Sequence, residues 1–80
     1  MDHRAEFRFK DGNAEKIYHA IAPEMAGEVN ARSHAECWLE SGEVLVLQVR
    51  ASDISALRAS LNMWLRLVNV AKEMQELGNS

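Results

Sequence analysis

His34 and Cys37 are the first side chains in this sequence to consider for metal binding or nucleophilic chemistry. They lie three residues apart in "RSHAECWLE" (32–40), where apolar and polar residues alternate as in a β-strand. Successive side chains of a strand point to opposite faces, so these two are expected on opposite sides of a sheet. No second His/Cys pair completes a zinc site, and we therefore expect no metal centre.

The carboxylates and glycines give no sign of a catalytic or phosphate-binding site. Carboxylates are spread singly along the chain, and Glu24 and Glu28 lie one turn apart only if a helix continues past Pro23. The four glycines stand alone, without the Gly-rich loop before a helix that cradles phosphate. We therefore expect no enzyme activity from this chain alone, and no cofactor.

Four arginines are candidates for RNA contact. Arg4 and Arg8 fall on one face of a predicted strand, and Arg32 and Arg50 are expected at the open end of a hairpin. The formal charge of −3 is opposite to the basic excess of proteins that bind nucleic acid by themselves. Two interpretations stay open: a solvated surface, or a small basic patch that touches phosphates only within a larger assembly.

The elements that position these residues follow in the order strand, helix, strand, strand, helix. Alternation predicts the strands, a spacing of three and four predicts the helices, and Pro23 is expected to end or restart the first helix. Ser41 and Gly42 are expected at the tip of a tight hairpin. The pattern indicates an α+β fold over residues 1–80, with two helices on one face of a three-stranded antiparallel sheet. The predicted segments are 3–9, 14–22, 32–40, 43–51 and 54–78.

The register of the hairpin stays open. A two-residue turn places Trp38 on the same face as Leu45 and Leu47, whereas a three-residue, bulged turn places Cys37 and Leu39 there. In either register both faces of the sheet carry large apolar residues, and helices cover only one of them. We therefore expect a homodimer formed through the sheet. The candidate dimer contacts are Val44, Val46 and Trp38.

The helix over residues 54–78 carries apolar side chains on two sides, at about 100° per residue. The first set, here called the Leu57 stripe, is Ile54, Leu57, Leu61, Leu65 and Val68. The second set, here called the Met63 stripe, is Ala56, Ala59, Met63, Leu67, Val70, Met74 and Leu77. A surface helix needs one apolar stripe, and monomers rarely expose a large second one. We therefore expect the Leu57 stripe to pack on the sheet and the Met63 stripe to bind a partner.

Length and composition set the class of protein. A chain of 80 residues forms one small domain, which buries only about 60% of its extended surface. A hydrophobic fraction of 48% with 26% charged residues is typical of a folded protein. With a single cysteine, no apolar span of about 20 residues and no apolar leader in "MDHRAEFRF", we expect a soluble, cytoplasmic protein.

The segment "ASDISALRASLN" (51–62), together with "AIAPE" (20–24) and "RS" (32–33), resembles a known family. This family is the small dimerising subunit of the KEOPS complex, whose name abbreviates "polarised growth and chromatin controller" and whose relatives include a cancer-testis antigen group. Its pattern is A-x-D at a strand-to-helix junction, followed by L-R-A-S-x-N. The matching positions are Ala51, Asp53, Leu57, Arg58, Ala59, Ser60 and Asn62.

The resemblance implies a non-catalytic homodimer that binds the threonylcarbamoyl transferase subunit of KEOPS. That enzyme modifies an adenosine beside the anticodon of tRNA, and the small subunit bridges copies of the complex and assists tRNA capture. On this interpretation a helical face docks on the transferase, Asp53 caps the long helix, and Arg58 and Asn62 hold its start in place. Two alternatives remain: a stand-alone nucleic-acid-binding domain, and a small oligomeric enzyme with its site between subunits.

Overall fold

The computed structural model describes residues 2–27 and 32–78, and it has the predicted order of elements. The three strands and two helices agree with the α+β fold read from the sequence, and each boundary moves by at most one residue except the end of the first helix, which moves by five. The elements are β1 (His3–Lys10), α1 (Ala14–Gly27), β2 (Ser33–Ser41), β3 (Val44–Ala51) and α2 (Ile54–Gly78).

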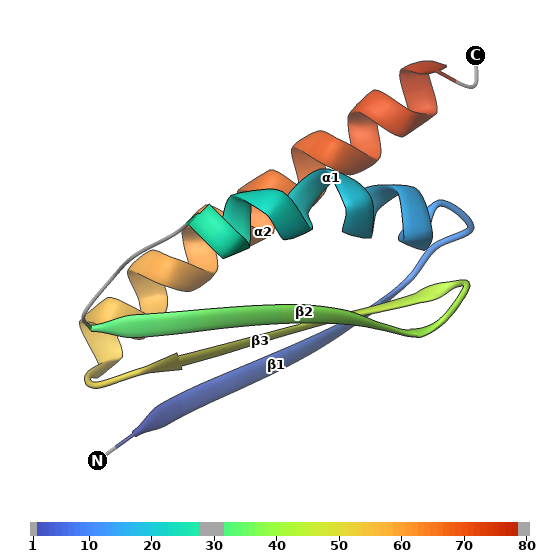
Figure 1. Ribbon diagram of the computed structural model, residues 1–80. Coiled ribbons are helices and arrows are strands. Elements are labelled where there is room, and N and C mark those ends of the chain that lie inside the picture. The colour runs from blue at the N-terminus through green and yellow to red at the C-terminus, as the bar shows by residue number, and fades with distance from the viewer. Residues whose placement is uncertain (1, 28–31, 79–80) are drawn as a thin grey trace.

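The sheet has the strand order β1-β3-β2, and both outer strands pair antiparallel with β3. Both helices lie on one face of this sheet, and the last turns of α2 rise away from it (Figure 1). The other face, here called the open face, has no helix over it. This is the predicted arrangement, and it leaves three surfaces for function: the open face and the two flanks of α2.

The hairpin differs from both predicted registers in the position of its turn. The turn falls at Gly42–Glu43, one residue later than expected, and the pairing shifts between Leu39 and Ser41. Cys37 and Leu39 lie opposite Leu47 and Leu45 on the face toward the helices, as in the bulged alternative. This register sends His34 and Glu36 to the face away from the helices, together with Trp38, because successive side chains of a strand alternate between the two faces.

Helix α1 continues through Pro23 to Gly27, five residues beyond the predicted end. A proline inside a helix lacks the N–H that would bond the carbonyl four residues earlier, here that of His19. Both Pro23 and His19 are exposed, so water can satisfy that carbonyl. The extra turn brings the half-buried Met25 against the core.

The core lies between the sheet and the two helices and forms two clusters, one around Ile17 and Ile21 of α1 and one around Trp64 of α2. Trp64 is the largest fully buried side chain and is only 1% exposed. The sequence interpretation left Trp64 out, although it falls between the two stripes. The buried side of α2 consists of Leu57, Ser60, Trp64, Val68 and Ala71. The two stripes are therefore the flanks of one wide apolar arc rather than two separate faces.

No helix in the described part of the chain is long and apolar enough to cross a membrane.

Candidate functional site

A shallow groove of about 200 Å³ runs between α1 and the flank of α2 that carries the Met63 stripe. Its lining is mostly apolar, with a carboxylate at one side: Ala20, Ile21, Glu24, Leu67, Val70, Ala71, Met74 and Gln75. Val70 is 51% exposed and Met74 is 65% exposed, although both are apolar. The groove therefore joins side chains of two helices into one exposed apolar surface.

The Met63 stripe divides along its length. Ala56, Met63 and Leu67 are half-buried and pack against the core, so the first half of the stripe is largely used inside the chain. Ala59 is exposed, as are Val70, Met74 and Leu77 in the second half of the stripe, and Val70 and Met74 line the groove beside α1. The predicted partner surface is thus concentrated at the carboxyl-terminal half of α2.

Sequence reasoning missed the contribution of α1 to this surface. Ala20 and Glu24 lie four residues apart and so share one side of a helix, but that spacing matters only if the helix continues past Pro23. The sequence interpretation expected the helix to end or restart there. The structure extends it and so places Glu24 at the groove.

The other flank of α2 lies toward the edge strand β1. Lys72 Nζ is 3.7 Å from Asp11 Oδ2, just after β1, which shows that this side of the helix faces the end of β1. Ile54 is 51% exposed on this flank, while Leu61 and Leu65 are half-buried. On β1, Phe7 is 39% exposed and stacks on Phe9 with ring centroids 6.4 Å apart. A second apolar surface therefore borders the free edge of β1.

Asp53 caps α2, as predicted. Its Oδ1 accepts a hydrogen bond from the backbone N–H of Ala56 at 2.8 Å, and its other carboxylate oxygen pairs with Arg32. The hydrogen bond from Arg32, followed by that from Ala56, lowers the pKa of the Asp53 carboxyl. These two contacts join the start of β2 to the start of α2.

Arg58 and Asn62 do not hold the start of α2, contrary to the expectation. Both side chains are exposed, and neither forms a hydrogen bond or an ion pair within residues 2–27 and 32–78. The side chain that contacts the start of α2 is instead that of Arg32, from the short "RS" match, which donates a hydrogen bond to Asp53. Arg58 and Asn62 are left as polar groups on the surface of α2.

The three predicted dimer contacts all lie on the open face, but their side chains differ in how much of their surface is exposed. Val46 is fully buried within the chain, between Arg8 and Trp38 in the sheet register. Trp38 is 37% exposed, and Val44 is half-buried. The apolar surface available here is therefore mainly that of Trp38.

The four candidate arginines do not form one patch. Arg8 donates hydrogen bonds to Glu40 at 3.1 Å and to Glu6 at 3.0 Å, and these carboxylates raise its pKa. Arg32 is paired with Asp53. Arg4 and Arg50 are directly opposite each other on β1 and β3, and within the described residues neither belongs to an ion pair.

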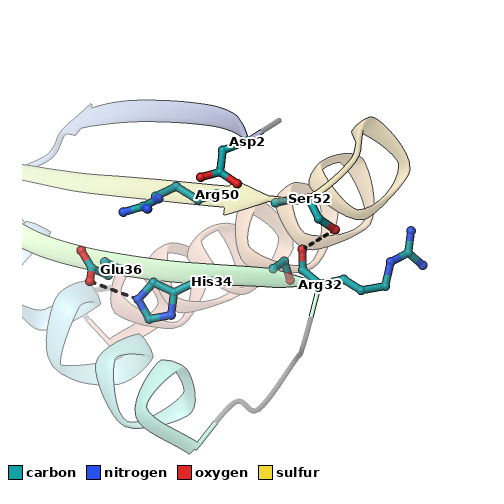
Figure 2. Close-up of a pocket in the computed structure, with 8 residues that line it drawn as sticks. Asp2, Arg32, His34, Glu36, Arg50 and Ser52 are labelled. Atoms are coloured by element: carbon teal, nitrogen blue, oxygen red, sulfur yellow. Dashed lines mark hydrogen bonds and ion pairs between the residues drawn. The ribbon is translucent and has the colours of Figure 1, made fainter.

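A pocket of about 400 Å³ lies at the end of the open face near Arg50 (Figure 2). Figure 2 shows Asp2 beside Arg50, and His34 turned toward Glu36, with 3.1 Å between His34 Nε2 and Glu36 Oε1. Ser52 Oγ donates a hydrogen bond to the backbone carbonyl of Arg32 at 3.4 Å. The pocket is open and polar, and it mixes both signs of charge.

The remaining chemistry-bearing groups lie apart. Among the described residues, no three His, Cys, Asp or Glu side chains are placed to hold a metal ion. Cys37 and His34 are on opposite faces of β2, as expected from their spacing. Cys37 is half-buried on the face toward the helices, and this burial raises the pKa of its thiol.

These observations define a small α+β domain with apolar surfaces on both flanks of its long helix and a charged open face. A family model described as "Transcription factor Pcc1" matches residues 2–76. The chain belongs to this family, which is the family of the KEOPS/EKC subunit, a non-catalytic accessory subunit related to tRNA processing. No curated protein sequence matches the chain significantly.

Proposed function

We propose that this chain is a non-catalytic subunit that binds the threonylcarbamoyl transferase of a KEOPS complex and so supports threonylcarbamoyladenosine formation in tRNA. The observation that carries the proposal is the groove between α1 and α2, with Val70 and Met74 exposed along it. The chain belongs to the Pcc1 family, and this membership supports the KEOPS complex as the assembly in which the groove binds its partner.

The shape of the groove favours a helical partner. Val70, Met74 and Leu77 follow the spacing i, i+4, i+7 and so form one apolar row along α2, against which an amphipathic partner helix can lay its own apolar side. Ala20 on α1 and Ala59 on α2 carry small side chains, so a partner helix can approach the backbone closely. Glu24 at the groove favours a basic residue on the partner helix.

We also propose that the chain forms a homodimer, and we place its contact at the β1 side rather than on the open face. There, Phe7 is exposed on β1, whose free edge can pair with a second strand, and Ile54 is exposed on the flank of α2 that carries the Leu57 stripe. On the open face Val46 adds no surface and charged residues surround Trp38. The two flanks of α2 then serve two partners: one a second copy, the other the transferase.

Co-purification of the full chain with the transferase subunit tests the proposal. Wild-type chain is expected to elute with the transferase from a sizing column, and alone it is expected to sediment as a dimer at micromolar concentration. A chain that sediments as a monomer rules out the homodimer, and a chain that never elutes with the transferase rules out the docking. The two results are independent of each other.

A further inference from the structure

A pocket of about 280 Å³ lies where the end of β1, the start of α1 and the middle of α2 meet. Its floor is apolar and consists of core side chains, none of which is more than 3% exposed: Ala14, Ile17, Leu45 and Val68. The half-buried Phe9 also lines it. Because core side chains are held in place by the packing around them, the floor of this pocket keeps its shape without a ligand.

The rim of the pocket carries side chains that can donate hydrogen bonds. Lys10 and Asn69 are exposed, and within residues 2–27 and 32–78 neither side chain forms a hydrogen bond or an ion pair. Lys72 is also exposed, and its Nζ is 3.7 Å from Asp11 Oδ2, which is longer than a hydrogen bond. An ammonium group has three N–H donors, so Lys72 can still bind a second acceptor.

The acidic side chain in the lining, that of Asp11, is already balanced by its neighbours. It is only 19% exposed, and its Oδ1 accepts a hydrogen bond at 2.8 Å from the backbone N–H of Asn13, at the start of α1. Its Oδ2 faces Lys72. Asp11 therefore does not cancel the charge of Lys10, which is the cation left to attract an anion from solution.

The groove between α1 and α2 carries the opposite charge. Its acidic residue is Glu24, and among the described residues no lysine or arginine lines it. The two pockets have no described lining residue in common. An anion with an apolar part is therefore attracted to the pocket beside Lys10 and repelled from the groove, so the two sites take different ligands.

We propose that the pocket beside Lys10 binds a small organic carboxylate, with its hydrocarbon part on Phe9, Ile17 and Val68 and its carboxylate beside Lys10 and Lys72. An apolar pocket with a few polar groups is the usual form of a small-molecule site. One water molecule takes about 30 Å³ in the liquid, so the volume suits a ligand of about ten non-hydrogen atoms. Octanoate has this size. The site needs neither the transferase nor a second copy, and so it is independent of the proposed function.

NMR titration of the full chain with sodium octanoate tests the proposal. A ligand of this size, held by exposed lysines, should bind with a Kd on the order of 1 mM. The methyl signals of Ile17, Leu45 and Val68 should shift and saturate, while those of Ile21 and Val70 at the groove should stay unchanged.

Two related compounds separate the contribution of the hydrocarbon part from that of the charge. Hexanoate lacks two CH₂ groups, each of which contributes about fourfold in affinity when buried, so its Kd should be roughly 15-fold higher. Octanamide keeps the chain but lacks the charge, and it should bind several-fold more weakly than octanoate. Equal binding of octanoate and octanamide would overturn the proposal, because the lysines would then have no role.

Substitutions at the rim test the two lysines. Exposed ion pairs contribute up to about fivefold, so Lys10→Gln and Lys72→Gln should each raise the Kd for octanoate by about two- to fivefold. Lys72→Gln should have the larger effect, because it also leaves Asp11 without a cation beside the bound carboxylate. Lys16→Gln is the matched control, since Lys16 is exposed on α1 but does not line the pocket. The control should bind octanoate like the wild type, and melting curves should show that all three variants are folded.

Four further results would contradict the proposal. An equal loss of affinity in the control would show non-specific attraction to lysines. Shifts at Ile21 and Val70 in place of Ile17 would assign octanoate to the groove. The same shifts with inorganic phosphate would show an anion contact that does not need the apolar floor. Octanoate binding that is lost as the concentration of the chain rises would show that a second copy covers the pocket.

Discussion

Val70→Glu tests whether the groove between the helices is the docking surface. In the free chain 51% of Val70 is exposed, so the substitution places a charge in water and should leave the fold intact. Docking of a helix would cover the exposed part. Burying a whole valine side chain contributes about 1.5–3 kcal/mol, so covering half of it contributes roughly 1 kcal/mol.

That contribution sets the expected changes in Kd for the transferase subunit. Val70→Ala should raise Kd by about fivefold, which corresponds to roughly 1 kcal/mol. Val70→Glu must in addition remove water from a carboxylate at several kcal/mol, so Kd should rise by roughly 100-fold or more. Isothermal titration of the full chain into the transferase subunit measures both.

Ile54→Glu is the matched control, because Ile54 is also 51% exposed but lies on the opposite flank of α2. It should leave transferase binding unchanged and weaken the homodimer in sedimentation, whereas Val70→Glu should do the reverse. Leu67 is a poor choice for this test, because it is half-buried and packs against the core. If Val70→Glu melts normally and binds like the wild type, the groove is not the docking surface.

Three further predictions concern the fold itself. Asp53→Ala should lower the melting temperature, while Asp53→Asn, which still caps the helix, should lower it less. The pKa of the Asp53 carboxyl is lowered in the folded chain, so its charge stabilises the fold above the unfolded pKa, and this stabilisation should be lost as pH falls through the folded pKa. The stability difference between wild type and Asp53→Asn should therefore be larger at neutral pH than in acid, and an equal difference at both would contradict this. Trp64→Ala should cost about 3–5 kcal/mol, enough to unfold much of so small a domain in urea titration. Cys37 should react slowly with iodoacetamide at neutral pH until the chain is unfolded, since burial raises its pKa; fast reaction of the folded chain would refute its burial.

The order of elements and the α+β fold could be predicted, because the change from alternation to helical spacing is strong in this chain. The hairpin register could not, since moving the turn by one residue is decided by a bulge near Glu40 that leaves no distinct sequence signal. Pro23 misled the prediction because its cost depends on whether water reaches the carbonyl of His19, which is a property of the folded surface.

The candidate site was half predicted for a related reason. The Met63 stripe was recognised from spacing, but spacing alone does not say which part of a wide apolar arc the sheet covers. Trp64 decides that question, because its large ring directs the middle of the arc toward the core and leaves both flanks at the margin. Arg4 and Arg50 lie opposite each other, outside any ion pair of residues 2–27 and 32–78, and this depends on the register of β1 on β3, which could not be predicted from the sequence.

Hydrogen exchange of the chain, alone and bound to the transferase subunit, tests the central claim most directly. The account predicts new protection of backbone amides in two places: the second half of α1, around Ile21 and Glu24, and α2 from Leu67 to Leu77. The strands should exchange as in the free chain. Two results would contradict it, provided that the complex forms: protection confined to the strands, or unchanged hydrogen exchange in both helices.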